Sequence, residues 1–135
     1  MVEVSAVKTM EELADIAYAK VNSRQISPHC HVGQVACALL ADNGNVYLGV
    51  CIDTACALGF CAEHAAIAHM ICDGESKIAK IVAVGEDRKI LAPCGRCREF
   101  MCQVNPKNLD TLVMVAPNTV VRLRELLPYA YVVEE

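Results

Sequence analysis

Residues 61–104 read CAEHAAIAHMICDGESKIAKIVAVGEDRKILAPCGRCREFMCQV, and this stretch decides the fold. Its alanine-rich beginning predicts a helix over residues 61–74, which ends at Gly74 because glycine readily takes the left-handed conformation of a helix end. The continuous apolar run 80–85 predicts a buried strand. A proline that suits a first helical turn opens a second helix over residues 93–104. The stretch is therefore a helix, a strand and a helix, with cysteines at both helix starts.

The flanking segments continue this alternation of helices and strands. A capping-box pattern predicts a helix over residues 9–22. The turn sequence Asp-Asn-Gly at residues 42–44 predicts an antiparallel hairpin that joins strands 34–41 and 45–53. Three further elements are expected towards the C-terminus: a strand over residues 110–116, a short helix over residues 122–127 and an edge strand in the tail.

Strand patterns that alternate with helical patterns predict an α/β fold built in layers. The chain has no internal repeat, low-complexity segment or long linker, and its 135 residues are the usual size of one domain. We therefore expect a single domain over residues 1–135.

Composition narrows the class of protein. The net charge is −4, aromatic residues make up 4% of the chain, and Lys and Arg do not cluster, so we expect no nucleic acid polymer as a partner. Acidic residues interrupt every apolar stretch before it reaches the roughly 18 residues of a membrane span, so we expect no membrane partner. The nine cysteines are an odd number, and the N-terminal sequence lacks the pattern of a secretory signal. We expect reduced thiols, a cytoplasmic protein and a small-molecule substrate.

The cysteines at the two helix starts are candidate metal ligands. Cys94 and Cys97 are three residues apart in a first helical turn, where they share one face. Cys61 is the natural third ligand if its helix begins beside theirs at the same sheet edge. Such a set predicts one Zn²⁺ per chain, with the fourth tetrahedral position open for a water molecule.

Glu63 is the candidate catalytic residue. It follows Cys61 by two residues and has a different bearing on the helix, so it can face the open position of the metal instead of ligating it. Zinc deaminases combine a His or Cys ligand, a Glu two residues later and a Pro-Cys-x-x-Cys segment, which here begins at Pro93. The residues fit the version with three cysteines.

Residues 61–65 (CAEHA) and 93–99 (PCGRCRE) resemble the small cytidine deaminase family, and the similarity extends over most of the chain. Within that family the sequence is similar to the blasticidin-S deaminase branch. Four features carry this closer similarity: residues 31–33 (HVG), residues 81–85 (IVAVG), residues 90–98 (ILAPCGRCR), and residues 124–128 (RELLP) followed by Tyr131.

The resemblance implies a fold, an assembly and a reaction. The fold is a three-layer α/β/α sandwich with a mixed sheet of about five strands, and the assembly is a homotetramer. The reaction is hydrolysis of a cyclic amidine, in which water attacks C4 of a cytosine ring, Glu63 moves the protons, and ammonia leaves a uracil-type product.

Two departures from the family pattern concern the substrate. Cys51 and Asp53 stand where cytidine deaminases usually carry an Asn and a Glu for the ribose, and we expect them to be substrate-binding residues. Cys51 is a weaker hydrogen-bonding partner than Asn, so ordinary ribose recognition is disfavoured. We expect a cytosine nucleoside of the blasticidin-S type or with another modified sugar. The alternative is an ordinary cytidine or deoxycytidine deaminase of pyrimidine salvage.

Two other classes of protein remain open. A thiol redox enzyme could use Cys94 and Cys97 as a reactive dithiol at a helix start, without a metal. A structural zinc-binding module for protein interaction would need a fourth protein ligand, for which the candidates are Cys56, His64 and Cys102.

Overall fold

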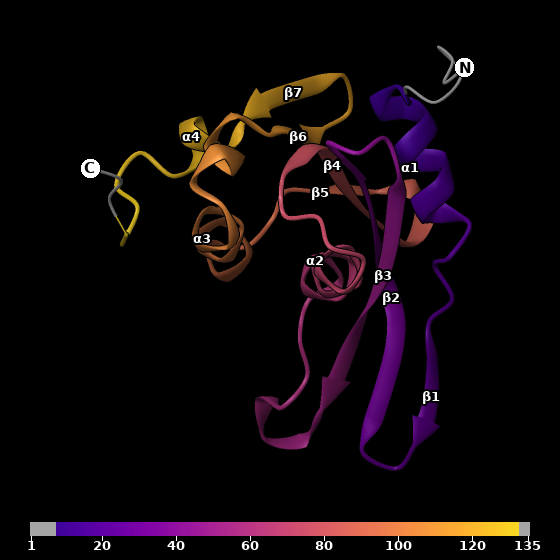
Figure 1. The fold of residues 1–135 in the computed structure, drawn as a ribbon. Coiled ribbons are helices and arrows are strands. Elements are labelled where there is room, and N and C mark those ends of the chain that lie inside the picture. Colours follow the sequence, from indigo (N-terminus) through magenta and orange to yellow (C-terminus); the bar gives the residue numbers. More distant parts are fainter. Residues whose placement is uncertain (1–7, 133–135) are drawn as a thin grey trace.

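One mixed sheet forms the centre of the computed structural model, which describes residues 8–132 (Figure 1). Strands β1, β2, β4, β6 and β7 lie side by side in this order, while β3 pairs with β2 and β5 with β4. Only β4 and β6 run parallel among the described pairs. The strands are β1 (Arg24–Ser27), β2 (Cys30–Ala41), β3 (Val46–Thr54), β4 (Ile78–Gly85), β5 (Ile90–Leu91), β6 (Leu112–Ala116) and β7 (Thr119–Arg122).

Helices cover both faces of this sheet (Figure 1). Helix α1 packs on one face, where Leu13 is buried with Val82 of β4. Helices α2 and α3 lie on the other face, where Ile67 and Met101 are buried with Ile81 of β4. The helices are α1 (Met10–Tyr18), α2 (Ala62–Cys72), α3 (Gly95–Val104) and α4 (Leu123–Leu126), with short 3₁₀ turns η2 (Ala55–Ala57), η3 (Glu86–Arg88) and η4 (Pro106–Asp110).

Neighbouring residues of β4 thus contribute to opposite cores, as the period of a strand requires. The expected three-layer α/β/α sandwich is confirmed. None of the helices within residues 8–132 has the length and apolar character that a bilayer crossing demands.

The predicted hairpin and helix starts are present. Strands β2 and β3 are antiparallel and joined through the turn, in which Gly44 has a φ of +87°. The capping box at Thr9 opens α1 as expected, but α1 ends at Tyr18 and not near residue 22. The backbone N–H of Asn22 instead donates to the carbonyl of Gly33, because the chain has already turned to join the edge of the sheet.

Within residues 8–132 the sheet has seven strands, not about five. Strand β1 is exposed along its whole length and β5 has two residues, so neither carries a hydrophobic period that the sequence could show. Strand β7 was also not predicted from the sequence. The expected edge strand of the tail is absent up to residue 132, and residues 133–135 lie outside the described part of the chain.

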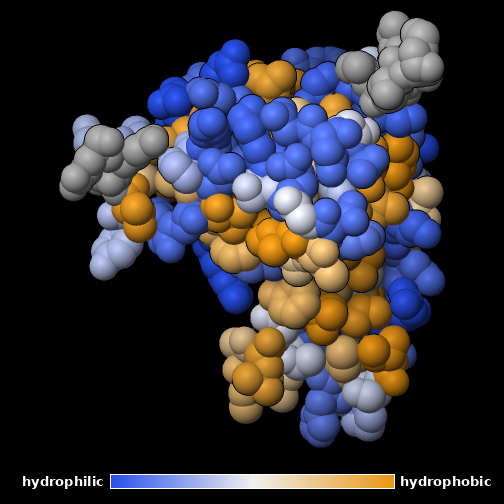
Figure 2. All heavy atoms as spheres, viewed as in Figure 1, coloured by the Kyte–Doolittle hydropathy of each residue, from blue (hydrophilic) through white to orange (hydrophobic). Residues whose placement is uncertain are grey.

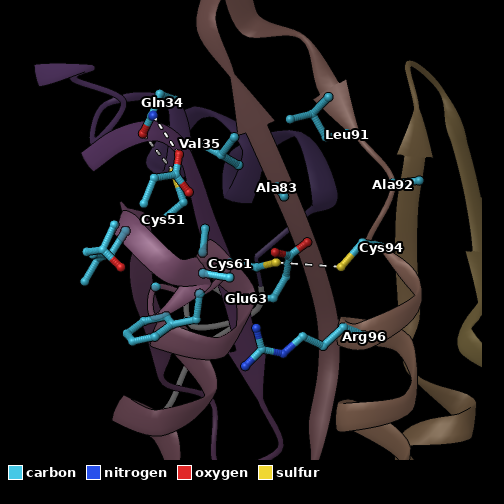
Figure 3. Close-up of a pocket in the computed structure, with 17 residues that line it drawn as sticks. Gln34, Val35, Cys51, Cys61, Glu63, Ala83, Leu91, Ala92, Cys94 and Arg96 are labelled. Carbon is cyan, nitrogen blue, oxygen red and sulfur yellow. Dashed lines mark hydrogen bonds between the residues drawn. The ribbon is translucent and has the colours of Figure 1, made fainter. Parts of the chain in front are cut away.

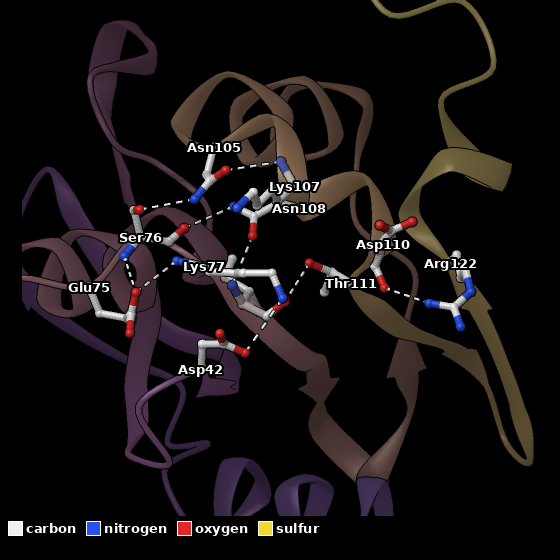
Figure 4. A network of polar contacts seen from close by, with 11 residues as sticks. Asp42, Glu75, Ser76, Lys77, Asn105, Lys107, Asn108, Asp110, Thr111 and Arg122 are labelled. Atoms are coloured by element: carbon white, nitrogen blue, oxygen red, sulfur yellow. Dashed lines mark hydrogen bonds and ion pairs between the residues drawn. The ribbon is translucent and has the colours of Figure 1, made fainter. Parts of the chain in front are cut away.

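A polar network fixes the starts of β4 and η4 relative to α3 (Figure 4). The side chain of Asn108 is fully buried, accepts from the backbone N–H of Ile78 at 2.8 Å and donates to the carbonyls of Ser76 and Met101. The hydroxyl of Thr111 donates to the carbonyl of Ile78 at 2.7 Å. A buried amide with these partners stabilises one arrangement of the chain, because loss of any partner leaves an unsatisfied polar group.

Candidate active site

The three predicted cysteine ligands converge at the starts of α2 and α3. Cys61 and Cys94 are the N-cap residues of these helices, and Cys97 lies in the first turn of α3. The Sγ atoms of Cys61 and Cys94 are 3.6 Å apart (Figure 3). Those of Cys94 and Cys97 are 3.7 Å apart. A zinc ion with bonds of about 2.3 Å to sulfur would separate two thiolates by about 3.8 Å along a tetrahedral edge. The donor types and their spacing therefore fit zinc.

The loop before Cys61 is held tightly against β3. Phe60 and Ile52 exchange two backbone hydrogen bonds, of 3.0 and 2.9 Å. A Cβ atom at Gly59 would lie 1.8 Å from the carbonyl oxygen of Ile52, so this approach requires glycine. Helix α2 itself packs closely on the strand, because a Cβ atom at Gly49 would lie 2.4 Å from the backbone nitrogen of Ala66. The position of Cys61 is thus set by the sheet.

The loop before Cys94 is held by Arg98. Its guanidinium donates to the carbonyl of Pro93 at 2.8 Å and to the carbonyl of Leu126 at 3.1 Å. This arginine therefore positions backbone, whereas Arg96 lines the neighbouring cavity. The two arginines beside the cysteines have different roles, which their spacing alone did not separate.

Glu63 is buried beside the cysteines, with 6% of its surface exposed. Its Oε1 lies 3.7 Å from the Sγ of Cys97. Burial raises the pKa of Glu63 above the ordinary value of a glutamate, against the opposing effect of hydrogen bonds to its backbone and to Cys97. A carboxyl group in this environment can hold a proton more readily than a solvated one, as a general acid and base requires.

The thiols are unequal. Burial raises the pKa of Cys61 and, much further, that of Cys97, with the carboxylate of Glu63 as an added cause. For Cys94 burial also acts upwards, but hydrogen bonds from the backbone of Cys97 and from the neighbouring thiols lower the pKa overall. Burial and mutual repulsion oppose the joint ionisation of three thiols and a carboxyl group, and a cation among them would offset both effects. The chemistry of the donor set thus also fits a divalent metal.

His64 also lies at this site and was considered above as a fourth ligand. Its Nδ1 is 3.4 Å from the Sγ of Cys97, and its ring stacks on Phe100 at a centroid distance of 4.2 Å. In the described residues, donor atoms of Cys61, His64 and Cys97 all lie within 4.8 Å of one another. Burial and the charge of Arg96 lower the pKa of His64, which favours the neutral form of the ring.

The imidazole ring of His64 can play one of two roles. It can donate one N–H to the thiolate of Cys97, or it can bind the metal in the fourth position. The two other candidates for a fourth ligand lie elsewhere: Cys56 is exposed in η2, and Cys102 lines a separate cavity beside Leu109 and Val132.

A cavity of about 460 Å³ opens next to the cysteines. This volume lies in the range of small-molecule sites. Cys61, Glu63 and Cys94 lie at one part of its wall, and Gln34 and Cys51 at another (Figure 3).

Both predicted substrate-binding residues line this cavity, and a third residue joins them. The amide nitrogen of Gln34 donates to Oδ2 of Asp53 at 2.9 Å, and the thiol of Cys51 donates to the amide oxygen of Gln34 at 3.1 Å. Sequence reasoning did not select Gln34. The available signal was its position as the one polar side chain in an otherwise apolar strand, residues 34–41.

The family described as "Cytidine and deoxycytidylate deaminase zinc-binding region" matches residues 7–113. The chain belongs to this family. The match includes all three cysteines and Glu63, so zinc is the metal of the family to which the site belongs.

Similar proteins agree with this membership. A cytidine deaminase of Halalkalibacterium halodurans is 30% identical over 105 residues, which cover 76% of this chain and 80% of that protein. A crystal structure of cytidine deaminase from Mycobacterium tuberculosis is similar with a TM-score of 0.77 and 25% identity, over 94% of this chain and all of that chain. A cytidine deaminase structure from Burkholderia pseudomallei has a TM-score of 0.73 and 27% identity, over 92% of this chain and all of that chain.

The predicted resemblance to the cytidine deaminase family is thereby confirmed. These relatives do not distinguish the blasticidin-S branch, which stays a prediction.

Zinc content tests which side chains ligate the metal. We expect about one zinc per chain in the purified protein and in the His64→Ala variant, and a large loss of zinc together with thermal stability in Cys94→Ala. Metal analysis and thermal unfolding measure both. The exposed Cys72→Ala is the matched control and should keep its zinc. Loss of zinc from His64→Ala with retention in Cys94→Ala would contradict this ligand set.

Proposed function

We propose that this protein catalyses the hydrolytic deamination of a cytosine nucleoside, with Cys61, Cys94 and Cys97 as ligands of one zinc ion. The buried carboxyl group of Glu63, beside three converging cysteines at the wall of a cavity, is the observation that carries this proposal. Zinc bound there supplies a water molecule of lowered pKa as the nucleophile.

Glu63 moves the protons of the reaction. Its carboxylate takes a proton from the water that attacks C4 and gives this proton to N3 of the cytosine ring. It then takes the remaining proton of the hydroxyl now bonded to C4 and delivers it to the amine at C4. Ammonia then leaves, and a uracil-type product with a carbonyl at C4 remains. The raised pKa of Glu63 suits this exchange, because a group that alternates between acid and base works best when its pKa lies close to the ambient pH.

The two helix starts support the chemistry electrostatically. Three thiolates carry more negative charge than zinc neutralises, which weakens the metal as a Lewis acid. The N-termini of α2 and α3 carry partial positive charge, and both begin at ligating cysteines. This arrangement offsets part of the excess charge.

The rival classes leave features of the site without a role. A thiol redox enzyme needs neither Cys61 nor the buried Glu63. A structural zinc module needs a fourth protein ligand, for which His64 is the candidate in place, but it does not need a cavity with Glu63 in its wall. A deaminase uses Cys61, the buried Glu63 and the cavity.

The substrate that we propose has a modified or extended sugar, as in nucleosides of the blasticidin-S type. Cys51 and Asp53 support this proposal, because they line the cavity where an Asn and a Glu would be expected for ribose. Ordinary cytidine or deoxycytidine is the second candidate, which the named relatives favour, since they are cytidine deaminases.

A homotetramer is also part of the proposal. Hydrophobic side chains gather over α2 and the adjoining loop in Figure 2. Leu58 and Phe60, which precede α2, and Ile71 of α2 are exposed. Phe60 also lines the cavity, so a neighbouring subunit on this face would help to close the site. The cytoplasmic location stays a prediction from the sequence.

Glu63→Gln tests the proton carrier. We expect this variant to keep its zinc and its fold but to lose a factor of about 10² to 10⁴ in turnover, because the amide cannot transfer protons. Ammonia release from a cytosine nucleoside measures the loss. Glu11→Gln, an exposed substitution on α1, should leave turnover unchanged. Near-normal turnover of Glu63→Gln would refute the role.

A substrate panel tests the sugar preference. We expect kcat/KM for blasticidin S to exceed that for cytidine and for deoxycytidine by roughly tenfold or more, since loss of one good hydrogen bond to a hydroxyl costs on the order of 1 kcal/mol. All three compounds share the cytosine ring, so differences in kcat/KM among them report how the cavity binds the sugar. If cytidine is clearly the best substrate, Cys51 and Asp53 are a tolerated variant of the ordinary ribose site.

A further inference from the structure

We propose that Gln34 determines which sugars the cavity accepts, by presenting a hydrogen-bond donor directly beside the acceptor of Asp53. The inference rests on the proposed nucleoside chemistry and names a residue for the end of the substrate that does not react. It concerns an amide on β2, in the strand next to the one that carries Cys51 and Asp53.

A bulge turns this amide into the cavity. In the pairing of β2 with β3, Val32 stands opposite Ile52 and Ala36 opposite Val50, so residues 33–35 share Cys51 as their only counterpart. Extra residues in one strand redirect a side chain without breaking the sheet. Gly33 makes this bulge possible, because it has a φ of +84° and a Cβ atom there would lie 2.2 Å from the carbonyl oxygen of Asn22.

The hydrogen bonds among Gln34, Cys51 and Asp53 leave one donor and one acceptor available to a ligand. Gln34 donates one amide hydrogen to Oδ2 of Asp53, and its oxygen accepts from the thiol of Cys51. A primary amide has two N–H donors and a carboxylate has two oxygens, so one N–H of Gln34 and Oδ1 of Asp53 remain to bind a ligand. Cys51 has given its single hydrogen to Gln34 and therefore does not replace an amide donor itself.

The available N–H of Gln34 and Oδ1 of Asp53 together complement a ligand group that both donates and accepts hydrogen bonds. A hydroxyl group on the sugar can donate to Asp53 and accept from Gln34, and a secondary amide can do the same through its N–H and C=O. Gln34 lies apart from Cys61, Glu63 and Cys94 on the cavity wall, as Figure 3 shows. With the ring carbon C4 at the cysteines, the substituent on the far side of the base would face Gln34 and Asp53.

Binding of product analogues tests the proposal without any turnover. The ligands are uridine, 3′-acetamido-2′,3′-dideoxyuridine and 2′,3′-dideoxyuridine, which carry hydroxyls, an amide or neither on the ring of the sugar. The proteins are the zinc-loaded wild type, Gln34→Met, and the exposed Gln25→Met of β1 as the matched control. Calorimetry gives the dissociation constants, and zinc content and thermal unfolding verify each protein.

The wild type and Gln25→Met should bind uridine, the acetamido compound or both about tenfold more tightly than the dideoxy compound. In Gln34→Met this ratio should fall to about two or less, while affinity for the dideoxy compound changes little. If uridine binds more tightly than the acetamido compound, a hydroxyl is the preferred group. If the acetamido compound binds more tightly, an amide is preferred.

An unchanged ratio in Gln34→Met, equal binding of all three ligands by the wild type, or no binding at all would overturn the proposal. Comparison among the ligands in the wild type keeps the test decisive if Gln34→Met does not fold. Failure of deamination is a separate result, because it would appear as absent ammonia release while the binding pattern persists.

Discussion

The approach of two helix N-termini, which brings the thiols of Cys61 and Cys94 to 3.6 Å, is the constraint on which the site depends. Each helix start is fixed by a different part of the molecule: the loop before Cys61 by the backbone of β3, and the loop before Cys94 by Arg98. The arrangement is unfavourable for ionised thiols and a carboxylate alone, as the raised pKa of Cys97 shows. A divalent cation at this point would reverse that effect, which links metal binding to the stability of the fold.

The residues that we propose for chemistry and for specificity come from different elements. The residues proposed for metal binding and proton transfer lie at the starts of α2 and α3, where the helix dipoles act. Gln34, Cys51 and Asp53 come from β2 and β3 and depend on a bulge in the sheet. Under this proposal, changes at the strands alter the choice of sugar while the reacting end of the cavity stays the same.

The sequence predicted the helix starts because their signals are local. Cysteine spacing, the Pro before Cys94 and the Asp-Asn-Gly turn each act within a few residues, and so does the capping box at Thr9. The role of Gln34 depends instead on the register between two strands and on a bulge, which no local pattern encodes. The same reason applies to β1 and β5, whose place comes from pairing with longer strands and not from a hydrophobic period of their own.

The stacking of His64 on Phe100 was equally invisible in the sequence, and it bears on the central question of whether the metal site is open. A hydrogen bond from His64 to Cys97 leaves one zinc position for water, whereas ligation by His64 closes it. X-ray absorption at the zinc edge of the purified protein separates these states most directly. We predict three sulfur neighbours at about 2.3 Å and one light atom without the outer-shell scattering of an imidazole ring. A fourth protein ligand in that spectrum, whether imidazole or sulfur, would contradict this prediction.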